Sequence, residues 1–254
     1  MEKLMEISHV GYSYHTPQGE TPALTNINFT VHQGDFLAIV GPSGCGKSTL
    51  LSLLAGLLEP ESGSILLYGQ KLLHPADSIG YMLQHDHLFE WRTIERNALL
   101  GLEIQKKLTP QTREKVLDMF KTYGLYKFKD AKPSQLSGGM RQRAAFIRTL
   151  ALDPKLLLLD EPFSALDYQT RLTVGDDIGS IIKKEQKTAV LVTHDLSEAV
   201  SLGTSVLVLS KRPATVKSII PISFPEYLSP LERRNAPEFK DYFNQIWKEL
   251  NENE

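Results

Sequence analysis

The stretch that decides the fold is Phe36-Leu-Ala-Ile-Val40 followed by Gly41-Pro42-Ser43-Gly44-Cys45-Gly46-Lys47-Ser48-Thr49. The apolar run is typical of a strand buried on both faces of a parallel sheet. The next residues match the pattern G-x-x-x-x-G-K-[ST], and leucines at helical spacing predict a helix from Lys47 to Leu58. A strand, a glycine-rich loop and a helix in this order predict a phosphate-binding loop, where backbone N–H groups and a helix N-terminus face an anion.

Within this loop the residue types suggest individual roles. Lys47 is expected to reach the β- and γ-phosphates, Ser48 to bind Mg²⁺, and Thr49 to lie beside the α-phosphate. The alternative, a glycine-rich turn with a surface lysine, is disfavoured by the strand before the loop and the helix after it. Cys45 fits the loop as a small side chain. The electropositive surroundings also allow a lowered thiol pKa, and we expect alkylating agents to inactivate the protein and bound ATP to protect it.

The composition excludes several classes of protein. The 254 residues carry 28 basic and 30 acidic side chains, and the net charge of −2 argues against a protein that mainly neutralises nucleic-acid phosphates. Apolar residues are 41% and charged residues 23%, ordinary values for a folded protein. A single cysteine rules out an internal disulfide framework. No segment approaches the ~20 apolar residues of a membrane helix and no signal peptide is evident, so a cytoplasmic protein is expected.

The pattern along the rest of the chain predicts an α/β fold. Apolar runs at 156–159, 188–192 and 206–209 indicate further buried strands, and 168–184 indicates a helix. Residues 91–152 are expected to be mostly helical, with helices at 113–123 and 139–152. The tail after Pro213 is expected to contain one amphipathic helix, 237–250, followed by frayed residues 251–254. A mostly parallel sheet with a helical insertion follows.

A second acidic element follows one of these strands. Leu156-Leu-Leu-Leu-Asp160-Glu161 places two carboxylates where a strand ends, which is the edge at which open α/β sheets bind ligands. Asp160 is expected to hold Mg²⁺ directly or through water, and Glu161 to polarise the water that attacks the γ-phosphorus. Alone, the pair could be a surface loop before Pro162; beside a phosphate-binding loop that alternative weakens.

A third element is Leu136-Ser137-Gly138-Gly139-Met140, upstream of the acidic strand. With the two motifs above, it resembles the signature of the ATP-binding cassette (ABC) ATPases, over about residues 1–215. The family signature usually has Gln where this chain has Met140. The resemblance implies a P-loop NTPase core with a mostly parallel sheet, an N-terminal antiparallel β region and a helical subdomain insertion. It implies a nucleotide-binding RecA-like core at 1–86 and 154–215, a helical signature subdomain at 87–153, and a C-terminal tail with one helix at 216–254.

The signature has a physical reading of its own. Ser137 suits a helix N-cap, and Gly138 and Gly139 allow close backbone approach at a helix start, which makes a second anion site. An ordinary capped helix remains the alternative for this element taken alone. One chain has one phosphate-binding loop, so a second anion site requires a second nucleotide. The resemblance implies a head-to-tail homodimer, with each ATP between one chain's loop and the other chain's signature.

Further positions carry roles through the resemblance alone. Gln84 resembles the Q-loop glutamine, Asp167 ends the D-loop that lines the dimer seam, and His194 resembles the switch histidine that contacts the γ-phosphate and orients Glu161. Tyr14 resembles the aromatic residue that stacks on adenine, with Tyr12 as its rival.

The resulting site prediction has three groups. Catalytic roles are expected for Glu161, His194 and Gln84, and Mg²⁺ contacts for Ser48, Gln84 and Asp160. ATP contacts are expected for Tyr14, Gly41, Pro42, Ser43, Gly44, Cys45, Gly46, Lys47, Ser48, Thr49, Ser137, Gly138, Gly139 and Asp167. ATP and Mg²⁺ are the expected cofactors. The pair His85 and His87 is a weak candidate for a metal site. Leu88 to Trp91 either contacts a permease or packs under the helical insertion, and the sequence leaves both open.

The resemblance implies the ATP-hydrolysing subunit of a bacterial transporter, most similar to the importers of nitrate, sulfonates and taurine. Such a subunit acts with separate transmembrane permease subunits at the cytoplasmic face of the cell membrane, as a peripheral protein, and indirectly with an extracytoplasmic solute-binding protein. The alternative is a soluble ABC ATPase that acts on nucleic acid or the ribosome. A non-catalytic scaffold would be expected to lack Glu161 or His194, and a small P-loop kinase would not explain Ser137 to Gly139. No residue of the chain identifies the solute, and no nucleic-acid partner is expected.

Overall fold

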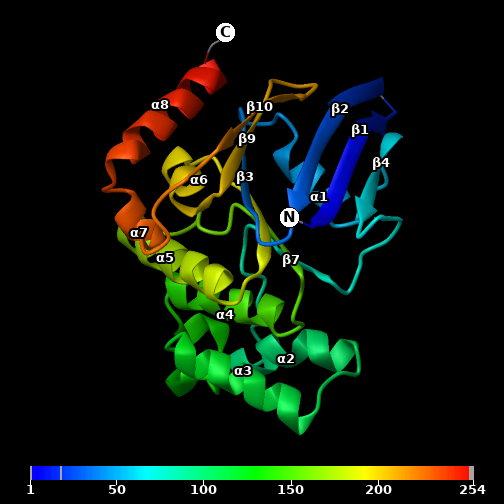
Figure 1. The fold of residues 1–254 in the computed structure, drawn as a ribbon. Helices are drawn as coiled ribbons and strands as arrows, with labels where there is room; N and C mark the ends of the chain where they lie inside the picture. The colour runs from blue at the N-terminus through cyan, green and yellow to red at the C-terminus, as the bar shows by residue number, and fades with distance from the viewer. Residues whose placement is uncertain (1, 18, 252–254) are drawn as a thin grey trace.

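The computed structural model describes residues 2–17 and 19–251. Its strands are β1 (Lys3–Thr16), β2 (Gly19–His32), β3 (Phe36–Val40), β4 (Ser62–Leu67), β5 (Gln70–Lys71), β6 (Ile79–Met82), β7 (Leu156–Asp160), β8 (Thr188–Val192), β9 (Ser205–Leu209) and β10 (Val216–Pro221). Its helices are α1 (Lys47–Leu54), α2 (Ile94–Ile104), α3 (Pro110–Thr122), α4 (Gly138–Leu150), α5 (Tyr168–Lys184), α6 (Leu196–Leu202), α7 (Pro230–Arg233) and α8 (Pro237–Asn251), with 3₁₀ turns η1 (Tyr126–Phe128) and η2 (Pro133–Gln135). Figure 1 shows how they are arranged.

The larger sheet positions the site. Its strand order is β10-β9-β3-β8-β7-β6, and every pair is parallel except β10 with β9. All residues of β3, β7 and β8 are buried, because α1 covers one face and helices cover the other. The carboxyl ends of parallel strands share one edge, so the loops after β3, β6, β7 and β8 meet there. The predicted mostly parallel sheet is confirmed.

The smaller sheet is antiparallel and formed by the N-terminal part of the chain. Its order is β2-β1-β4-β5. The inward side chains of β1 and β2, such as Ile7 and Ile27, share a buried cluster with Leu50 and Leu54 of α1 and with Leu158 of β7. Helix α1 is therefore held between the two sheets, which confirms the N-terminal antiparallel region.

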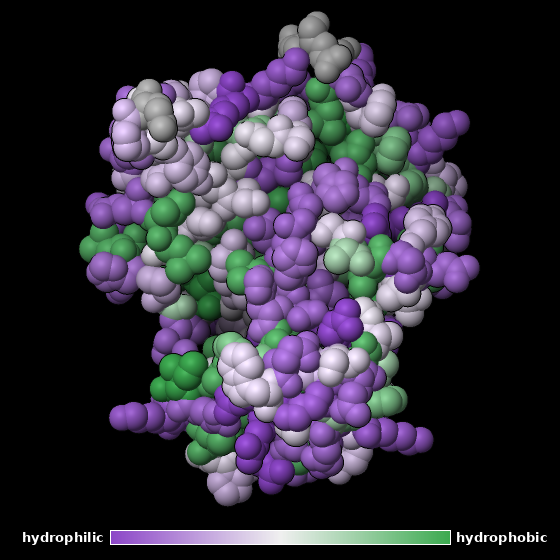
Figure 2. All heavy atoms as spheres, turned by 180° about the vertical axis from the view of Figure 1, so that it is seen from behind, coloured by the Kyte–Doolittle hydropathy of each residue, from purple (hydrophilic) through white to green (hydrophobic). Residues whose placement is uncertain are grey.

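The segment between β6 and β7 is helical, as predicted. Helices α2, α3 and α4 lie below the large sheet in Figure 1, and a second buried cluster joins them, with Phe120 and Phe146 at its centre. From behind, Figure 2 shows a narrow waist above this helical part and a surface on which hydrophilic and hydrophobic residues are mixed.

Helix α1 ends four residues before the predicted Leu58. Gly56 has a φ of 70°, and its N–H donates to Leu53 O (3.0 Å) while the Leu57 N–H donates to Ser52 O (3.0 Å). These two bonds form a Schellman C-cap, which needs a residue in the left-handed region. The leucine spacing continues past Gly56 to Leu58, so it predicts a longer helix than the one that forms.

The C-terminal segment holds more structure than the one predicted helix. Strand β10 pairs with β9 in the large sheet, and a short helix, α7, precedes α8. Ser229 caps α7 and bonds reciprocally with Glu232, with Pro230 at the first helical position. This Ser-Pro-Leu-Glu sequence is a capping box that periodicity alone misses. Residue Asn251 is helical, and residues 252–254, where fraying was expected, lie outside the described residues.

Candidate functional site

The glycine-rich loop 41–46 connects β3 to α1 at the carboxyl edge of the large sheet. Gly44 and Gly46 have φ values of 72° and 117°, which glycine adopts without the strain of a Cβ. A Cβ on Gly46 would lie 3.0 Å from the Leu24 side chain. Glycine at this position therefore lets the loop turn closely against β2 before α1 starts.

The Lys47 side chain folds back over this loop. Its Nζ donates to the carbonyl oxygens of Gly41 (2.9 Å) and Pro42 (3.0 Å), and the residue is buried. The ammonium group is thus held over the loop, at the place where the sequence predicts phosphate. The rest of the predicted phosphate contacts, Ser43, Gly44, Cys45, Gly46, Ser48 and Thr49, belong to the same loop and to the first turn of α1.

Cys45 belongs to the loop, and its side chain is buried. The residue is only 1% exposed, and burial raises the pKa of its thiol although Lys47 acts in the opposite direction. A Cβ on Gly41 would lie 2.9 Å from the Cys45 sulfur, so the thiol fills the space beneath the loop. The suggestion of a lowered thiol pKa is wrong, because burial outweighs the positive surroundings. The expectation that alkylating agents inactivate the protein, with protection by ATP, loses its basis for the same reason.

Asp160 faces α1 from the end of β7. Its Oδ1 accepts a hydrogen bond from Ser48 Oγ (3.1 Å) and its Oδ2 one from the Tyr81 hydroxyl (3.5 Å). Burial raises the pKa of Asp160. Burial, with Asp160 beside it, also raises the pKa of Tyr81 to about 12. Ser48 and Asp160, two of the three residues predicted to bind Mg²⁺, are therefore adjacent oxygen donors, the ligand type that Mg²⁺ prefers.

Glu161 lies next to two side chains from the loops that follow β8 and β6. Its Oε2 is 3.0 Å from His194 Nδ1 and 3.5 Å from Gln84 Nε2. Its φ of 43° places a non-glycine residue in the left-handed region, a conformation that costs about 1–3 kcal/mol. The Glu161 N–H donates to Val192 O (2.9 Å), which ties this backbone to the end of β8. The three residues predicted to be catalytic lie together.

The loop after Glu161 is tied to the segment after β8 by Arg171, which sequence reasoning missed. Arg171 Nη2 donates to the carbonyl oxygens of Ser164 (3.4 Å) and Leu166 (3.1 Å). Its guanidinium also forms ion pairs with Asp195 (3.6 Å) and Glu198 (3.9 Å). The sequence carries no local signal for these ion pairs, because Asp195 and Glu198 lie on a distant segment of the chain.

Asp167 is the N-cap of α5, and its carboxylate accepts the Thr170 N–H (3.1 Å). The Thr170 side chain, and after it the Thr170 N–H, lowers the pKa of Asp167 by hydrogen bonding to the carboxylate. The N-terminus of α4 lies nearby: a Cβ on Gly139 would meet Thr170 at 2.6 Å, and one on Gly138 would meet Leu166 at 3.3 Å. The glycines of the signature therefore allow α4 to start against the D-loop and α5.

Ser137 caps α4, as its sequence predicts, by accepting the Met140 N–H (3.4 Å). Among the described residues, no hydrogen bond joins Ser137, Gly138 or Gly139 to the loop 41–49 of the same chain. The two predicted anion sites are thus separate elements of the chain.

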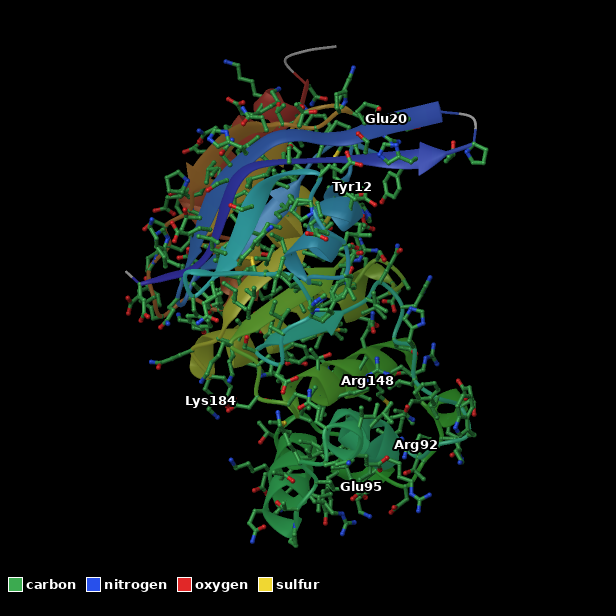
Figure 3. The ribbon with its side chains drawn as sticks, turned by 90° about the vertical axis from the view of Figure 1, so that its right-hand side faces the viewer. Tyr12, Glu20, Arg92, Glu95, Arg148 and Lys184 are labelled. Atoms are coloured by element: carbon green, nitrogen blue, oxygen red, sulfur yellow. The ribbon has the colours of Figure 1, made fainter. Side chains whose placement is uncertain are left out.

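Tyr14 and Tyr12 lie side by side near the end of β1, with ring centroids 5.1 Å apart. The Tyr14 hydroxyl bonds with Thr49 Oγ1 (2.9 Å), and the residue is 40% exposed. Tyr12 packs against the buried cluster beneath the small sheet, and Figure 3 shows it under that sheet. The geometry favours Tyr14, whose ring is free to contact a base beside α1.

A family model described as "ABC transporter" matches residues 24–164, more than half of the chain. The chain belongs to the ABC transporter family. It is 46% identical over 250 residues to an uncharacterized ABC transporter ATP-binding protein of Bacillus subtilis (strain 168), covering 97% of this chain and 95% of the relative. It is 40% identical to a nitrate import ATP-binding protein of Synechocystis sp. (95% and 93% covered) and 38% identical to an aliphatic sulfonates import ATP-binding protein of Bacillus licheniformis (91% and 88% covered).

Among solved structures, this ABC ATPase matches the dimeric cassette MJ0796 bound to ADP and Pi, with a TM-score of 0.75 and 29% identity over 87% of this chain and all of that chain. The chain is therefore an ATP-binding, ATP-hydrolysing subunit of an ABC transporter, as its motifs predict. No helix within the described residues is both long and apolar enough to cross a membrane.

The basic face of α4 is neutralised inside the cassette. Arg141 pairs with Asp86 (3.1 Å) and Arg143 with Asp177 (2.6 Å). Arg148, on the helical part in Figure 3, donates to the carbonyl oxygens of Asp86 (2.7 Å) and His87 (2.8 Å). The contacts of Arg141 and Arg148 hold the segment after Gln84, and the Arg143 pair joins α4 to α5. These three arginines therefore form no open basic stripe for nucleic acid. The described residues include no group of three or more His, Cys, Asp or Glu side chains arranged for a metal ion, and the rings of His85 and His87 only pack edge to face.

Proposed function

We propose that this cassette powers import of a small anion or sulfonate-like solute through separate transmembrane permease subunits. The observation that carries the proposal is the convergence of Lys47, Asp160 with Ser48, and Glu161 with His194 at one edge of the sheet. The relatives named for nitrate and sulfonate import support the solute class. The alternative, action on nucleic acid, is disfavoured because the arginines of α4 that the structure describes are already bonded to Asp86, Asp177 and backbone carbonyls.

The chemistry of each side chain in this site suggests its role. Lys47 and the N–H groups of loop 41–46 would bind the phosphates of ATP, and Tyr14 would stack on adenine. Ser48, Asp160 and Gln84 would hold Mg²⁺, which offsets phosphate charge when bound. The oxygens of Ser48 and Asp160 already lie 3.1 Å apart, so this donor set fits the ion.

Hydrolysis would use Glu161 as the base. It would accept a proton from water as the water oxygen bonds to the γ-phosphorus and the bond to the ADP oxygen breaks. His194, 3.0 Å from Glu161, would hold the carboxylate in place and donate to the γ-phosphate. Gln84 would orient the same water from the end of β6.

The second half of each nucleotide site would come from another copy of the chain. Ser137, Gly138 and Gly139 form a capped helix start that is not bonded to the chain's own phosphate loop. The solved relative is dimeric with ADP and Pi. We therefore propose a homodimer in which ATP closes the seam and hydrolysis reopens it, because the γ-phosphate contacts both chains only before cleavage.

The permease would dock beside the Gln84 loop. Trp91 is 73% exposed and Phe89 36%, and their rings pack together with centroids 4.7 Å apart. The buried Asn97 side chain accepts the Phe89 N–H (2.7 Å) and holds this exposed pair on the loop. The sequence left open whether these rings contact a permease or pack under the helical insertion, and their exposure supports the permease contact. The cassette would then sit at the cytoplasmic face of the membrane, with a solute-binding protein on the other side.

Mixing two inactive variants tests the shared sites. Lys47→Ala should lose ATP binding, and Ser137→Arg should block hydrolysis while a single chain still binds ATP. In a heterodimer one site combines the intact loop with the intact signature, so the mixture should recover up to about a quarter of wild-type activity. No recovery, with a specific activity that does not fall on dilution, would refute the dimer.

Stimulation of the permease complex by a sulfonate or nitrate, in proteoliposomes with the binding protein, tests the solute.

A further inference from the structure

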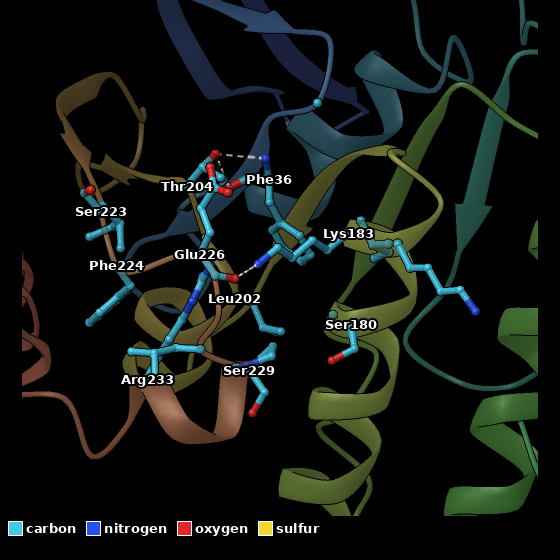
Figure 4. Close-up of a pocket in the computed structure, with 18 of the residues that line it drawn as sticks. Phe36, Ser180, Lys183, Leu202, Thr204, Ser223, Phe224, Glu226, Ser229 and Arg233 are labelled. Carbon is cyan, nitrogen blue, oxygen red and sulfur yellow. Dashed lines mark hydrogen bonds between the residues drawn. The ribbon is translucent and has the colours of Figure 1, made fainter.

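A cavity of about 630 Å³ lies at the opposite edge of the large sheet from the nucleotide site. Its walls come from the amino end of β3, the turn between α6 and β9, the C-terminal half of α5, the end of α6 and the segment 222–233. Figure 4 shows Lys183 reaching into this region from α5 and Arg233 from α7. The volume is within the range of about 300–1,000 Å³ that is usual for small-molecule sites.

The inner wall of this cavity is apolar. Phe36, Ile182, Leu202 and Ile222 line it, and each is at most 7% exposed. Such a wall favours the apolar part of a ligand, since binding there removes apolar surface from water.

The wall is also rigidly built. A Cβ on Gly179 of α5 would meet Leu202 at 2.5 Å and Pro230 at 2.9 Å, so this glycine allows α5 to pack closely against α6 and α7. The Leu231 N–H donates to Asp176 Oδ1 (2.7 Å), which fastens α7 to α5. The cavity is therefore framed by packed helices on one side and by the tail segment 222–233 on the other.

Cations without carboxylate partners line the same cavity. Lys183 Nζ donates to the backbone carbonyl of Glu226, and no carboxylate of a described residue forms an ion pair with Lys183 or Arg233. Lys187, in contrast, pairs with Asp153. Lys183 and Arg233 thus supply positive charge that the fold itself does not neutralise.

Arg233 has an unused donor here. Its Nη1 donates to Ser201 O (3.1 Å), and its guanidinium carbon lies 5.5 Å from the centre of the Phe224 ring. Its Nε is buried and has no hydrogen-bond partner among the described residues. A buried N–H without a partner costs free energy, so the guanidinium is not fully satisfied by the fold.

We propose that this cavity is a second ligand site, separate from the nucleotide site, which binds a small organic anion with a sulfonate or carboxylate head and an apolar body. The head would bind between Lys183 and Arg233, and the body would lie against Phe36, Leu202 and Ile222. Inorganic anions lack the apolar part and should bind poorly.

Anilinonaphthalene sulfonate, a fluorescent aromatic anion, is the probe for this site. It is titrated into the full chain with the nucleotide site saturated by Mg²⁺ and ADP. Hexanesulfonate should displace one bound probe per chain, and sulfate at equal concentration should not. Lys183→Glu should weaken that site about tenfold or more, since it removes a charge-assisted contact and adds repulsion.

Lys71→Glu is the matched control, because the substitution changes the charge by the same amount. Lys71 is exposed on β5 and does not line the cavity. Lys183 is exposed, so its variant should keep the wild-type unfolding temperature and ADP affinity. Arg233→Gln provides a second variant with the same expected loss. Equal probe binding in Lys183→Glu and Lys71→Glu, or displacement by sulfate as effective as by hexanesulfonate, would overturn the proposal. Because the readout is probe binding, neither outcome bears on ATP hydrolysis.

Discussion

Replacing Arg171 by Met should destabilise the cassette in a pH-dependent way. Glu198 is buried at 5% exposure, and its Oε2 accepts a hydrogen bond from Thr193 Oγ1 (2.6 Å). Burial raises the pKa of Glu198, and Arg171, 3.9 Å away, counteracts part of that rise. Without Arg171 the carboxylate loses a cation and the pKa rises further.

The magnitude follows from the geometry. Removing one partner of a fully buried ion pair costs about 3–5 kcal/mol. Here the pair is long and the Arg171 side chain is 22% exposed, so we expect about 2 kcal/mol, which corresponds to a fall of about 4–8 °C in Tm. The carbonyl oxygens of Ser164 and Leu166 also lose their donor, so the ATPase rate should fall.

The pH dependence of Tm separates the lost ion pair with Glu198 from the lost hydrogen bonds to Ser164 and Leu166. A carboxyl group whose folded pKa lies above its unfolded value destabilises the fold progressively as pH rises between those two values. Arg171→Met raises the folded pKa of Glu198 further, so this pH range extends to higher pH. The difference in Tm between wild type and Arg171→Met should therefore be largest at about pH 8 and shrink towards about pH 5, where Glu198 takes up a proton at less cost.

Thermal unfolding at both pH values, followed by circular dichroism, is the assay. Glu198→Gln removes the buried charge and keeps an acceptor for Thr193, so the double variant with Arg171→Met should recover at least half of the lost stability at the higher pH. A Tm difference that is the same at both pH values, together with no recovery in the double variant, would refute the reasoning.

Three further outcomes are expected. Glu161→Gln should bind ATP, accumulate as a closed dimer on size-exclusion chromatography and hydrolyse ATP at least ~10²-fold more slowly; normal turnover would show that Glu161 is not the base. Tyr14→Ala should weaken ATP binding, while Tyr12→Ala should lower Tm more than it changes ATP affinity; the reverse result in fluorescence titrations would assign adenine to Tyr12. Cys45 should react slowly with iodoacetamide in the folded cassette, with or without ATP, and a mass-spectrometric rate close to that of free cysteine would contradict its burial.

Much of the site could be predicted from sequence because its parts are local. Gly41 to Ser48, and Ser137 with its two glycines, are defined by backbone conformation and hydrogen bonds within a few residues, so the pattern carries the geometry. Helix boundaries were less certain, because Gly56 ends α1 through bonds that the leucine spacing does not reveal. The short capped helix α7 was missed for the same reason: its signal is a capping box and not a period.

The sequence by itself determined the fold class, the phosphate-binding loop and the residue types available for hydrolysis. Tertiary structure alone decided which of these residues meet. His194 reaches Glu161 and Asp160 reaches Ser48 because the order β3-β8-β7-β6 brings the ends of strands far apart in sequence to one edge. It also decided that Cys45 is buried, that Arg171 links two loops, and that Lys183 and Arg233 face one cavity. Packing between distant segments sets burial and pairing, and no local pattern of side chains encodes either.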